Sequence, residues 1–340
     1  MDALKTDLCG VLGVELPIVQ APIGSASCPA LAAAVSNAGG LGMLALSWTD
    51  ENSVRRAIRE TRELTDRPFG VNLVLEWDQR ERLAACLEEG VHIVSFFWGD
   101  PIPYAETVHE AGGLVLHSIG ETREAVAATR ERAADVIVAQ GWKAGGHVRG
   151  TVASMSLVPR VVDAVAPVPV VAAGGVADGR GLVAALALGA VGAWIGTQFL
   201  LAEEAATHDA YRAAVLQADE TGTVYSSLFD GGWPDAPHRT LRNSTVEAWE
   251  AAGRPPKGKR PREGEIVATG PDGRPVERYE DTIPLPGSSG SVEALAMYAG
   301  QGVGLADRVQ PARSIVGEIT REAAEVLNDL GAATRLRDEW

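Results

Sequence analysis

One histidine in a glycine-rich loop is well placed to move a proton. His147 ends the segment 140–147, which reads Gln-Gly-Trp-Lys-Ala-Gly-Gly-His and follows an apolar run. Because its pKa is near neutrality, a histidine can accept a proton from a weak carbon acid, a step that typically contributes about 10²–10⁴-fold to rate. We therefore predict that His147 is a catalytic base; the alternative is a hydrogen-bonded surface histidine.

Two other glycine-rich segments are suited to a phosphate. Residues 173–176 read Ala-Gly-Gly-Val and residues 196–198 read Gly-Thr-Gln. They offer unhindered backbone N–H groups and the hydroxyl of Thr197. Either segment alone could be a tight turn without a ligand, but together they favour phosphate. No G-x-G-x-x-G fingerprint follows a first strand and no Walker A motif is present, so a Rossmann domain or an NTPase is not indicated.

Each of these glycine-rich segments follows a short run of apolar or β-branched residues, and such runs recur along the chain. The runs cover 17–21, 41–46, 69–75, 92–98, 114–118, 135–140, 168–173 and 191–195. None alternates polar and apolar residues, so each strand should be buried on both faces, as in a parallel sheet. Stretches of helical period lie between them, at 29–37, 51–64, 79–89, 121–132, 155–165 and 179–188. Eight such units can close into a barrel, so we predict an α/β fold, a (β/α)8 TIM barrel.

In such barrels the loops after the strands build the active site, and phosphate commonly binds after strands seven and eight. His147 and both phosphate segments would then lie at one rim. His117 ends the fifth run and could contact a ligand at the same rim. The other histidines are better explained structurally, since His92 begins a run, His109 and His208 fall in helical segments, and His238 lies in an irregular one.

After the eighth run the periodicity breaks down. Residues 220–290 are rich in Gly, Pro and charged residues, and this segment is too long for an ordinary loop. A basic cluster within it, at 254–262, is expected to be solvated. The aromatic residues Tyr225, Phe229, Trp233 and Trp249 favour a partly ordered lid over a disordered insertion. Helical period returns at 291–298 and 311–330. The expected organisation is a barrel (1–219), an inserted lid-like segment after strand eight (220–290) and C-terminal helices packing on the barrel (291–340).

Composition excludes several classes of protein. The net charge of -15 repels nucleic-acid phosphates and anionic lipid. Three cysteines without CxxC spacing indicate neither a disulfide framework nor a thiolate zinc site, and no other metal-binding motif is present. The N-terminus lacks a signal-peptide pattern, and the apolar run 182–196 is broken by Gly189 and Gly192 and is too short to span a bilayer. We expect a cytoplasmic protein with no membrane or nucleic-acid partner.

Several motifs follow one another along the chain, at segments 17–24, 37–42, 70–73, 144–147, 173–179 and 195–199. In this order they resemble the nitronate monooxygenase (2-nitropropane dioxygenase-like) family of FMN barrels, and the resemblance covers about the first 220 residues. That family includes flavin-dependent enoyl-ACP reductases and some NADH:quinone reductases.

The resemblance implies FMN-dependent oxidation of alkyl nitronates, with nitroalkanes as a wider substrate class, by O2 to a carbonyl compound and nitrite. His147 matches the proton acceptor of the family. The small-molecule substrate and O2 would be the partners, and the oligomeric state, including a homo-oligomer, is left open. The positions matching the FMN-binding residues are Pro22, Ile23, Gly24, Asn72, Gln140, Ala173, Gly174, Gly175, Gly196 and Thr197.

The sequence departs from the commoner family pattern at Lys143, where an acidic residue often precedes the A-G-G-H segment. Lys143 could favour an anionic substrate electrostatically or simply face solvent. The segment 298–304 resembles that of family reductases. This resemblance keeps an alternative open, an NAD(P)H-dependent flavin reductase acting on an enoyl thioester or a quinone. A noncatalytic flavin-binding barrel is a third hypothesis.

Overall fold

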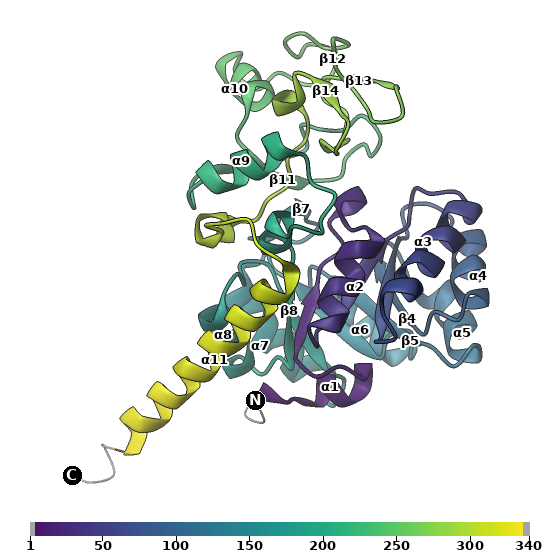
Figure 1. Ribbon diagram of the computed structural model, residues 1–340, viewed down its shortest axis with the longest axis vertical. Helices are drawn as coiled ribbons and strands as arrows, with labels where there is room; N and C mark the ends of the chain where they lie inside the picture. The colour runs from purple at the N-terminus through teal and green to yellow at the C-terminus, as the bar shows by residue number, and fades with distance from the viewer. Residues whose placement is uncertain (1–3, 336–340) are drawn as a thin grey trace.

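Eight parallel strands form a closed barrel in the computed structural model, which describes residues 4–335 (Figure 1). The sheet order is β1-β9-β8-β6-β5-β4-β3-β2, and a parallel bridge between Val19 and Leu41 joins its two ends. The strands are β1 (Ile18–Gln20), β2 (Gly42–Ala45), β3 (Phe69–Val74), β4 (Ile93–Phe97), β5 (Leu114–Ile119), β6 (Val136–Gln140), β8 (Val170–Ala173) and β9 (Gly192–Ile195). The predicted TIM barrel and its eight strands are confirmed.

Helices form an outer layer around the strands. They are α2 (Pro29–Asn37), α3 (Glu51–Leu64), α4 (Arg80–Glu88), α5 (Ile102–Glu110), α6 (Thr122–Arg130), α7 (Ser154–Val165) and α8 (Gly179–Ala187). Side-chain caps fix several starts: Asp50 accepts a hydrogen bond from the Ser53 amide at α3, and Asp178 accepts one from the Gly181 amide at α8. Six of these helices were predicted with bounds close to those observed, and α5 was expected only in that His109 was placed in a helical segment.

Residues alternate between the barrel interior and the helical layer along each strand. On β5, Val115 packs against the helices, whereas Leu116 packs inside with Met43 and Val138. The short helix α1 (Asp7–Leu12) adds Leu8 and other apolar side chains to this interior cluster and lies at the end of the barrel away from the cap segment (Figure 1). The barrel interior is therefore a packed core, and the cavity described below lies at its other end.

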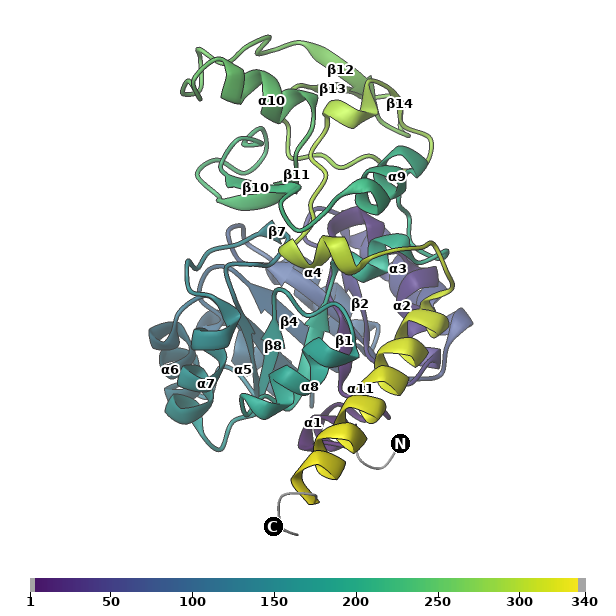
Figure 2. The ribbon, with the colours of Figure 1, turned by 90° about the vertical axis from the view of Figure 1, so that its left-hand side faces the viewer.

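Residues 220–290, here called the cap segment, lie over the carboxyl ends of the barrel strands (Figure 2). They contain β10 (Thr223–Ser226), β11 (His238–Leu241), α10 (Ser244–Ala251), β12 (Ile266–Thr269), β13 (Pro275–Glu277) and β14 (Ser289–Gly290). The strands form two three-stranded sheets, one of which includes the two-residue strand β7 (Gly146–His147) of the barrel. A 3-10 helix (Thr197–Leu201) and α9 (Asp209–Gln217) connect β9 to the cap segment.

The sequence suggested that the basic cluster at 254–262 is solvated, but one of its arginines is buried. Arg260 is buried, lies 2.9 Å from the Asp230 carboxylate and stacks over the Tyr279 ring. Its neighbour Arg262 is exposed and pairs with Glu265. The guanidinium of Arg260 therefore acts as an anchor inside the cap segment, which the run of basic residues alone could not reveal.

The C-terminal part differs from the sequence prediction in one place. Within 291–298, only Val292–Ala294 form a 3-10 turn, so the predicted helix is wrong. The chain runs extended beside β11, where the Leu241 amide donates to the Met297 carbonyl at 2.7 Å. The predicted helix 311–330 is present as α11 (Ala312–Arg335), which packs on α2 and α8; residues 336–340 lie outside the described part. No helix in residues 4–335 is long and apolar enough to cross a membrane.

Replacing Gly42 by alanine should destabilise the barrel. A Cβ atom at Gly42 would lie 1.9 Å from the backbone oxygen of Ala32, where neither β2 nor α2 can move easily. We expect the free energy of unfolding to fall by about 2 kcal/mol or more. Gly10→Ala, in helix α1 with nothing within 4 Å, is the control and should leave stability unchanged or slightly raised. Chemical denaturation followed by tryptophan fluorescence measures both, and equal midpoints would contradict the described packing.

Candidate active site

A cavity of about 370 Å³ lies between the barrel and the cap segment. Each of the eight strands contributes a cavity-lining residue near its carboxyl end, namely Ala21, Ala45, Asn72, Phe97, Ser118, Gln140, Ala173 and Trp194. These residues form the floor of the cavity. The roof includes residues 232–233 and 281–283 of the cap segment. The floor is therefore set by strand pairing, whereas the roof depends on how the cap segment is anchored.

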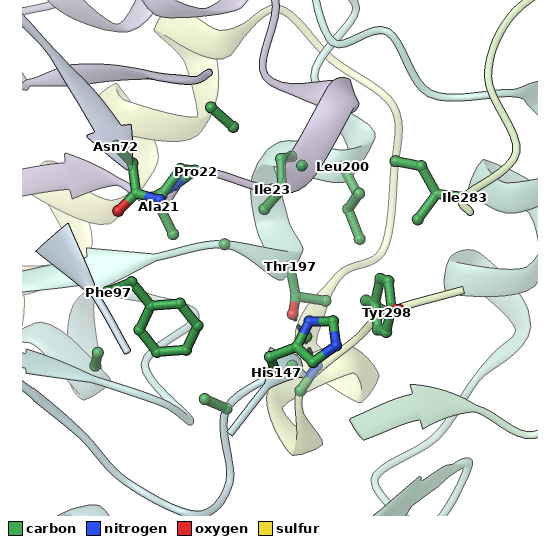
Figure 3. A pocket seen from close by; sticks show the side chains of 18 of the residues that line it. Ala21, Pro22, Ile23, Asn72, Phe97, His147, Thr197, Leu200, Ile283 and Tyr298 are labelled. Carbon is green, nitrogen blue, oxygen red and sulfur yellow. Dashed lines mark hydrogen bonds between the residues drawn. The ribbon is translucent and has the colours of Figure 1, made fainter. Parts of the chain in front are cut away.

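All of the residues predicted for the site line this one cavity. Asn72, His147 and Thr197 are among those labelled in Figure 3. The predicted residues come from loops far apart in the sequence, which the closed barrel brings to a single rim. The set comprises His147 and the positions Pro22, Ile23, Gly24, Asn72, Gln140, Ala173, Gly174, Gly175, Gly196 and Thr197.

The two glycine-rich ends provide backbone and hydroxyl donors. Gly174 and Gly175 have φ values of 91° and 82°, and a Cβ at Gly174 would lie 2.7 Å from the Gly141 oxygen, so a side chain is excluded there. The Thr197 hydroxyl accepts a hydrogen bond from the Gly300 amide at 3.0 Å. Its own hydrogen is then available to another acceptor. Such a surface can hold an anion such as a phosphate.

Three buried polar atoms at the cavity have no protein partner. Among the described residues, the Asn72 Oδ1, Gln140 Oε1 and His147 Nε2 atoms have no hydrogen bond. Buried polar atoms are rarely left unpaired, because each costs about 1–3 kcal/mol. The two amide oxygens accept hydrogen bonds and the ring nitrogen can accept a proton, so a bound molecule with N–H or acidic C–H groups fits this arrangement.

The loop that carries His147 is held on three sides. Gly145 packs directly on the backbone of Ala299 and Gly300, and a Cβ there would lie 2.5 Å from both. The Gln140 side chain donates to the His147 carbonyl at 3.1 Å. On the third side β7 pairs antiparallel with β11, which places His147 opposite His238. The flexible-looking glycine loop is therefore fixed by its contacts.

Aromatic rings surround the imidazole of His147. The Trp233 ring lies 4.2 Å away with an interplanar angle of 31°, and the Tyr298 and His238 rings each lie 5.4 Å away. Burial, and then the neighbouring His238, lower the pKa of His147 well below its usual value. The imidazole is therefore neutral at neutral pH, the form that accepts a proton.

His238 lies on β11 and is buried, not in an irregular stretch as the sequence suggested. Its Nε2 accepts a hydrogen bond from the Phe229 amide at 3.2 Å, so Nδ1 carries the hydrogen and donates to the Ala236 carbonyl at 2.9 Å. Burial lowers the pKa of His238 to about 4. Both nitrogens are thus used in holding the cap segment, and the ring supports His147 as a neutral neighbour.

Two other residues singled out by the sequence lie outside the cavity. His117 is buried on β5 with its side chain on the helical side of the barrel wall, and the adjacent Ser118 faces the cavity instead. Lys143 lies beside the phosphate-type loop, where its side-chain carbons would contact a Cβ at Gly175. Neither residue lines the cavity itself.

The site also contains residues that sequence reasoning did not assign to it. Trp233 and Asp281 come from the cap segment, and Tyr298 from the extended stretch after it. In the sequence, Trp233 is one of four aromatic residues that favour an ordered lid, and it is not assigned to the site. Nothing in the local sequence marks Asp281, since an aspartate in a charged loop is normally solvated.

Comparison with known proteins agrees with this geometry. The family model for nitronate monooxygenase matches residues 5–81 and 76–322. The chain belongs to the nitronate monooxygenase family. It is accordingly an oxidoreductase, and relatives of this family act on small molecules.

The proteins that are similar to this chain differ in the reactions they are named for. A (3aS,4S,5R,7aS)-5-hydroxy-7a-methyl-1-oxo-octahydro-1H-indene-4-carboxyl-CoA dehydrogenase from Mycobacterium tuberculosis is 41% identical over 74% of this chain and 70% of its own length. A nitronate monooxygenase from Paraburkholderia phytofirmans is 32% identical over 96% and 97%. The structure of FabK from Thermotoga maritima is similar with a TM-score of 0.79 and 30% identity, covering 97% of this chain and 99% of that one.

The buried neutral state of His147 should appear in the pH dependence of stability. Because the folded-state pKa lies below that of the unfolded chain, the unfolded chain binds more protons at acidic pH, and this contribution to stability is lost as the pH falls below about 6.5. We expect the loss of stability between pH 7.5 and pH 5 to be smaller in His147→Gln than in the native chain. His92→Gln, at an exposed position, is the control. Parallel pH curves for the native chain and His147→Gln would refute the buried neutral state.

Proposed function

We propose that this protein is an FMN-dependent enzyme that oxidises alkyl nitronates, and the nitroalkanes from which they form, with O2 to a carbonyl compound and nitrite. The observation that carries the proposal is the unpaired, buried Nε2 of a neutral His147 in a cavity with a phosphate-type loop. Membership of the nitronate monooxygenase family supports the reaction class.

The chemistry of the cavity fits FMN. A flavin ring carries an N–H group that can donate a hydrogen bond to an unpaired amide oxygen such as that of Asn72 or Gln140. The glycine backbone at 174–175 and the Thr197 hydroxyl supply donors for its phosphate. When bound, FMN would supply the electron acceptor for oxidation of the substrate. The remaining positions assigned to it are Pro22, Ile23, Gly24, Ala173 and Gly196.

His147 is proposed to accept a proton from the carbon next to the nitro group. Its neutral imidazole is ready to do so, and the aromatic rings around it exclude water from the acceptor nitrogen. A substrate that arrives already as the nitronate needs no such step. The role of His147 is therefore specific to the neutral, protonated form of the substrate.

The proposal assigns separate tasks to three parts of the chain. The barrel, residues 1–219, would hold FMN and His147. The cap segment, residues 220–290, would act as a lid that supplies Trp233 over the imidazole. Residues 291–340 would fasten the lid, since the stretch before α11 contacts both β11 and the His147 loop.

Nitrite release tests the proposed reaction. The FMN-saturated protein should release nitrite from 2-nitropropane and from propyl nitronate in air. In His147→Asn we expect kcat/KM for the neutral nitroalkane to fall by about 10²–10⁴-fold, with a much smaller change for the nitronate, because only the former needs a base. His92→Asn should match the native chain for both substrates. Absence of nitrite above the protein-free blank with both substrates would exclude the proposed function.

A second candidate function is an NAD(P)H-dependent flavin reductase or dehydrogenase acting on an acyl thioester. The specific observations are the similarity to a CoA-thioester dehydrogenase and to FabK, an enoyl reductase. In that case His147 would exchange a proton at a carbon next to the thioester carbonyl instead of next to a nitro group.

Anaerobic reduction distinguishes the two functions. If the second candidate is correct, NADH or NADPH should bleach the flavin absorbance, and an enoyl thioester or a quinone should restore it. If nitronate oxidation is correct, a nitronate should bleach the flavin and the nicotinamides should have little effect. Flavin that is bleached by neither compound would contradict both assignments.

A further inference from the structure

A buried arginine on β11 has no acidic partner. Arg239 is 2% exposed, and no carboxylate in the described part of the chain pairs with its guanidinium. Its Nε atom also has no hydrogen-bond partner. Burial lowers the pKa of Arg239, but an arginine side chain keeps its positive charge in proteins. A buried charge is costly unless its surroundings compensate it, so the neighbours of this guanidinium show what the arginine is for.

Two aromatic rings and a backbone carbonyl surround the Arg239 guanidinium. Its central carbon lies 4.6 Å from the centre of the Trp142 ring and 5.6 Å from that of the Tyr225 ring. One Nη atom donates to the Trp142 carbonyl at 2.9 Å, and the other donates to the Thr223 hydroxyl at 3.4 Å. Cation–π contacts are strongest where the cation is desolvated. Arg239 therefore both stacks on and hydrogen-bonds with Trp142, a residue of the loop that carries His147.

The contacts of Arg239 reach both sides of His147 along the chain. Trp142 comes before His147 in the loop, and Val148 follows directly after it. The Tyr225 hydroxyl, on the ring beside the guanidinium, donates to the Val148 carbonyl at 3.1 Å. The Trp142 and Tyr225 rings also contact each other edge to face, with their centres 5.6 Å apart. One cluster of three side chains thus holds the loop before and after the base.

The strand register explains this arrangement. On β11, Arg239 pairs with Tyr225 of β10 on one side and with Gly146 of β7 on the other, in the sheet between cap segment and barrel (Figure 2). Side chains alternate between the two faces of a strand, so Arg239 and His238 point to opposite faces. His238 lies beside the imidazole of His147, and Arg239 therefore holds the same loop from the other face.

We propose that Arg239 is a positioning residue, which holds the loop on both sides of His147 and so sets the imidazole at the cavity. The loop needs such contacts because it contains the glycines 141, 145 and 146, whose backbones are conformationally free. A catalytic group displaced by about 1 Å can lose about 10²-fold in rate. The effect of Arg239 on rate rests on the proposed function, whereas its effect on the loop does not.

Hydrogen–deuterium exchange tests the positioning role without turnover. Several backbone amides in residues 141–148 donate hydrogen bonds, among them those of Trp142, Ala144 and Val148. Their exchange in the FMN-saturated protein reports how often the loop opens. In Arg239→Met we expect this exchange to accelerate by about tenfold or more, while the amides of β3 and β4 keep their native rates. The control is Arg242→Met, which removes an exposed arginine paired with Glu250 and should leave the loop unchanged.

Three results of the exchange measurement would overturn the proposal. They are an unchanged loop in Arg239→Met, an equal acceleration in β3 and β4, and an equal acceleration of the loop in Arg242→Met. If Arg239→Met fails to fold, Tyr225→Phe keeps the ring beside the guanidinium and removes only the hydrogen bond to Val148. We expect exchange at Val148 to accelerate in that variant, and native exchange there would also overturn the proposal.

A comparison of two substrates separates positioning of the base from a general loss of activity. In Arg239→Met, kcat/KM for 2-nitropropane should fall by about 10–10²-fold, with a much smaller change for propyl nitronate, because only the neutral substrate needs the base. Arg239→Lys keeps the charge without the planar guanidinium and should recover part of the loss. Equal losses for both substrates, or a lysine variant no better than the methionine variant, would contradict the positioning role. If the native protein releases no nitrite, the proposed function fails, and the exchange measurement still decides the role of Arg239.

Discussion

The backbone pairing between β7 and β11 is the contact on which the site depends. It joins two residues of a barrel loop to a strand of the cap segment and sets His147 opposite His238. Without it, the glycines before His147 would leave the loop free to adopt many conformations. Trp233, in the segment between β10 and β11, lies against the imidazole, so the strand pair and this segment together bury His147.

Much of the barrel could be predicted from the sequence because local pattern and tertiary role agree there. Each strand is a buried apolar run bounded by turn residues, and the residues that end these runs must meet at one rim once the sheet closes. The hydroxyl of Thr197 could thus be assigned to this rim from the strand pattern, whereas Asn72 and Gln140 were assigned through the family resemblance; all three line one cavity.

The roof could not be predicted in the same way, because tertiary contacts decide its conformation. Residues 291–298 have helical period but run extended to hydrogen-bond with β11. In the sequence, His238 is one polar residue in an irregular stretch. Only the fold shows that it is buried and that its ring lies next to that of His147. Arg260 and Asp281 belong to equally polar stretches, yet one is an internal anchor and the other lines the cavity.

The division of the cavity into a strand-built floor and a separately anchored roof has a consequence for variation within this fold. Substitutions on the floor disturb the hydrogen-bonded cylinder and its packed interior, so few of them can be tolerated. Changes in residues 220–290 act on a different cluster of apolar side chains. Residues 220–290 can therefore vary with less effect on the barrel core than the floor residues can.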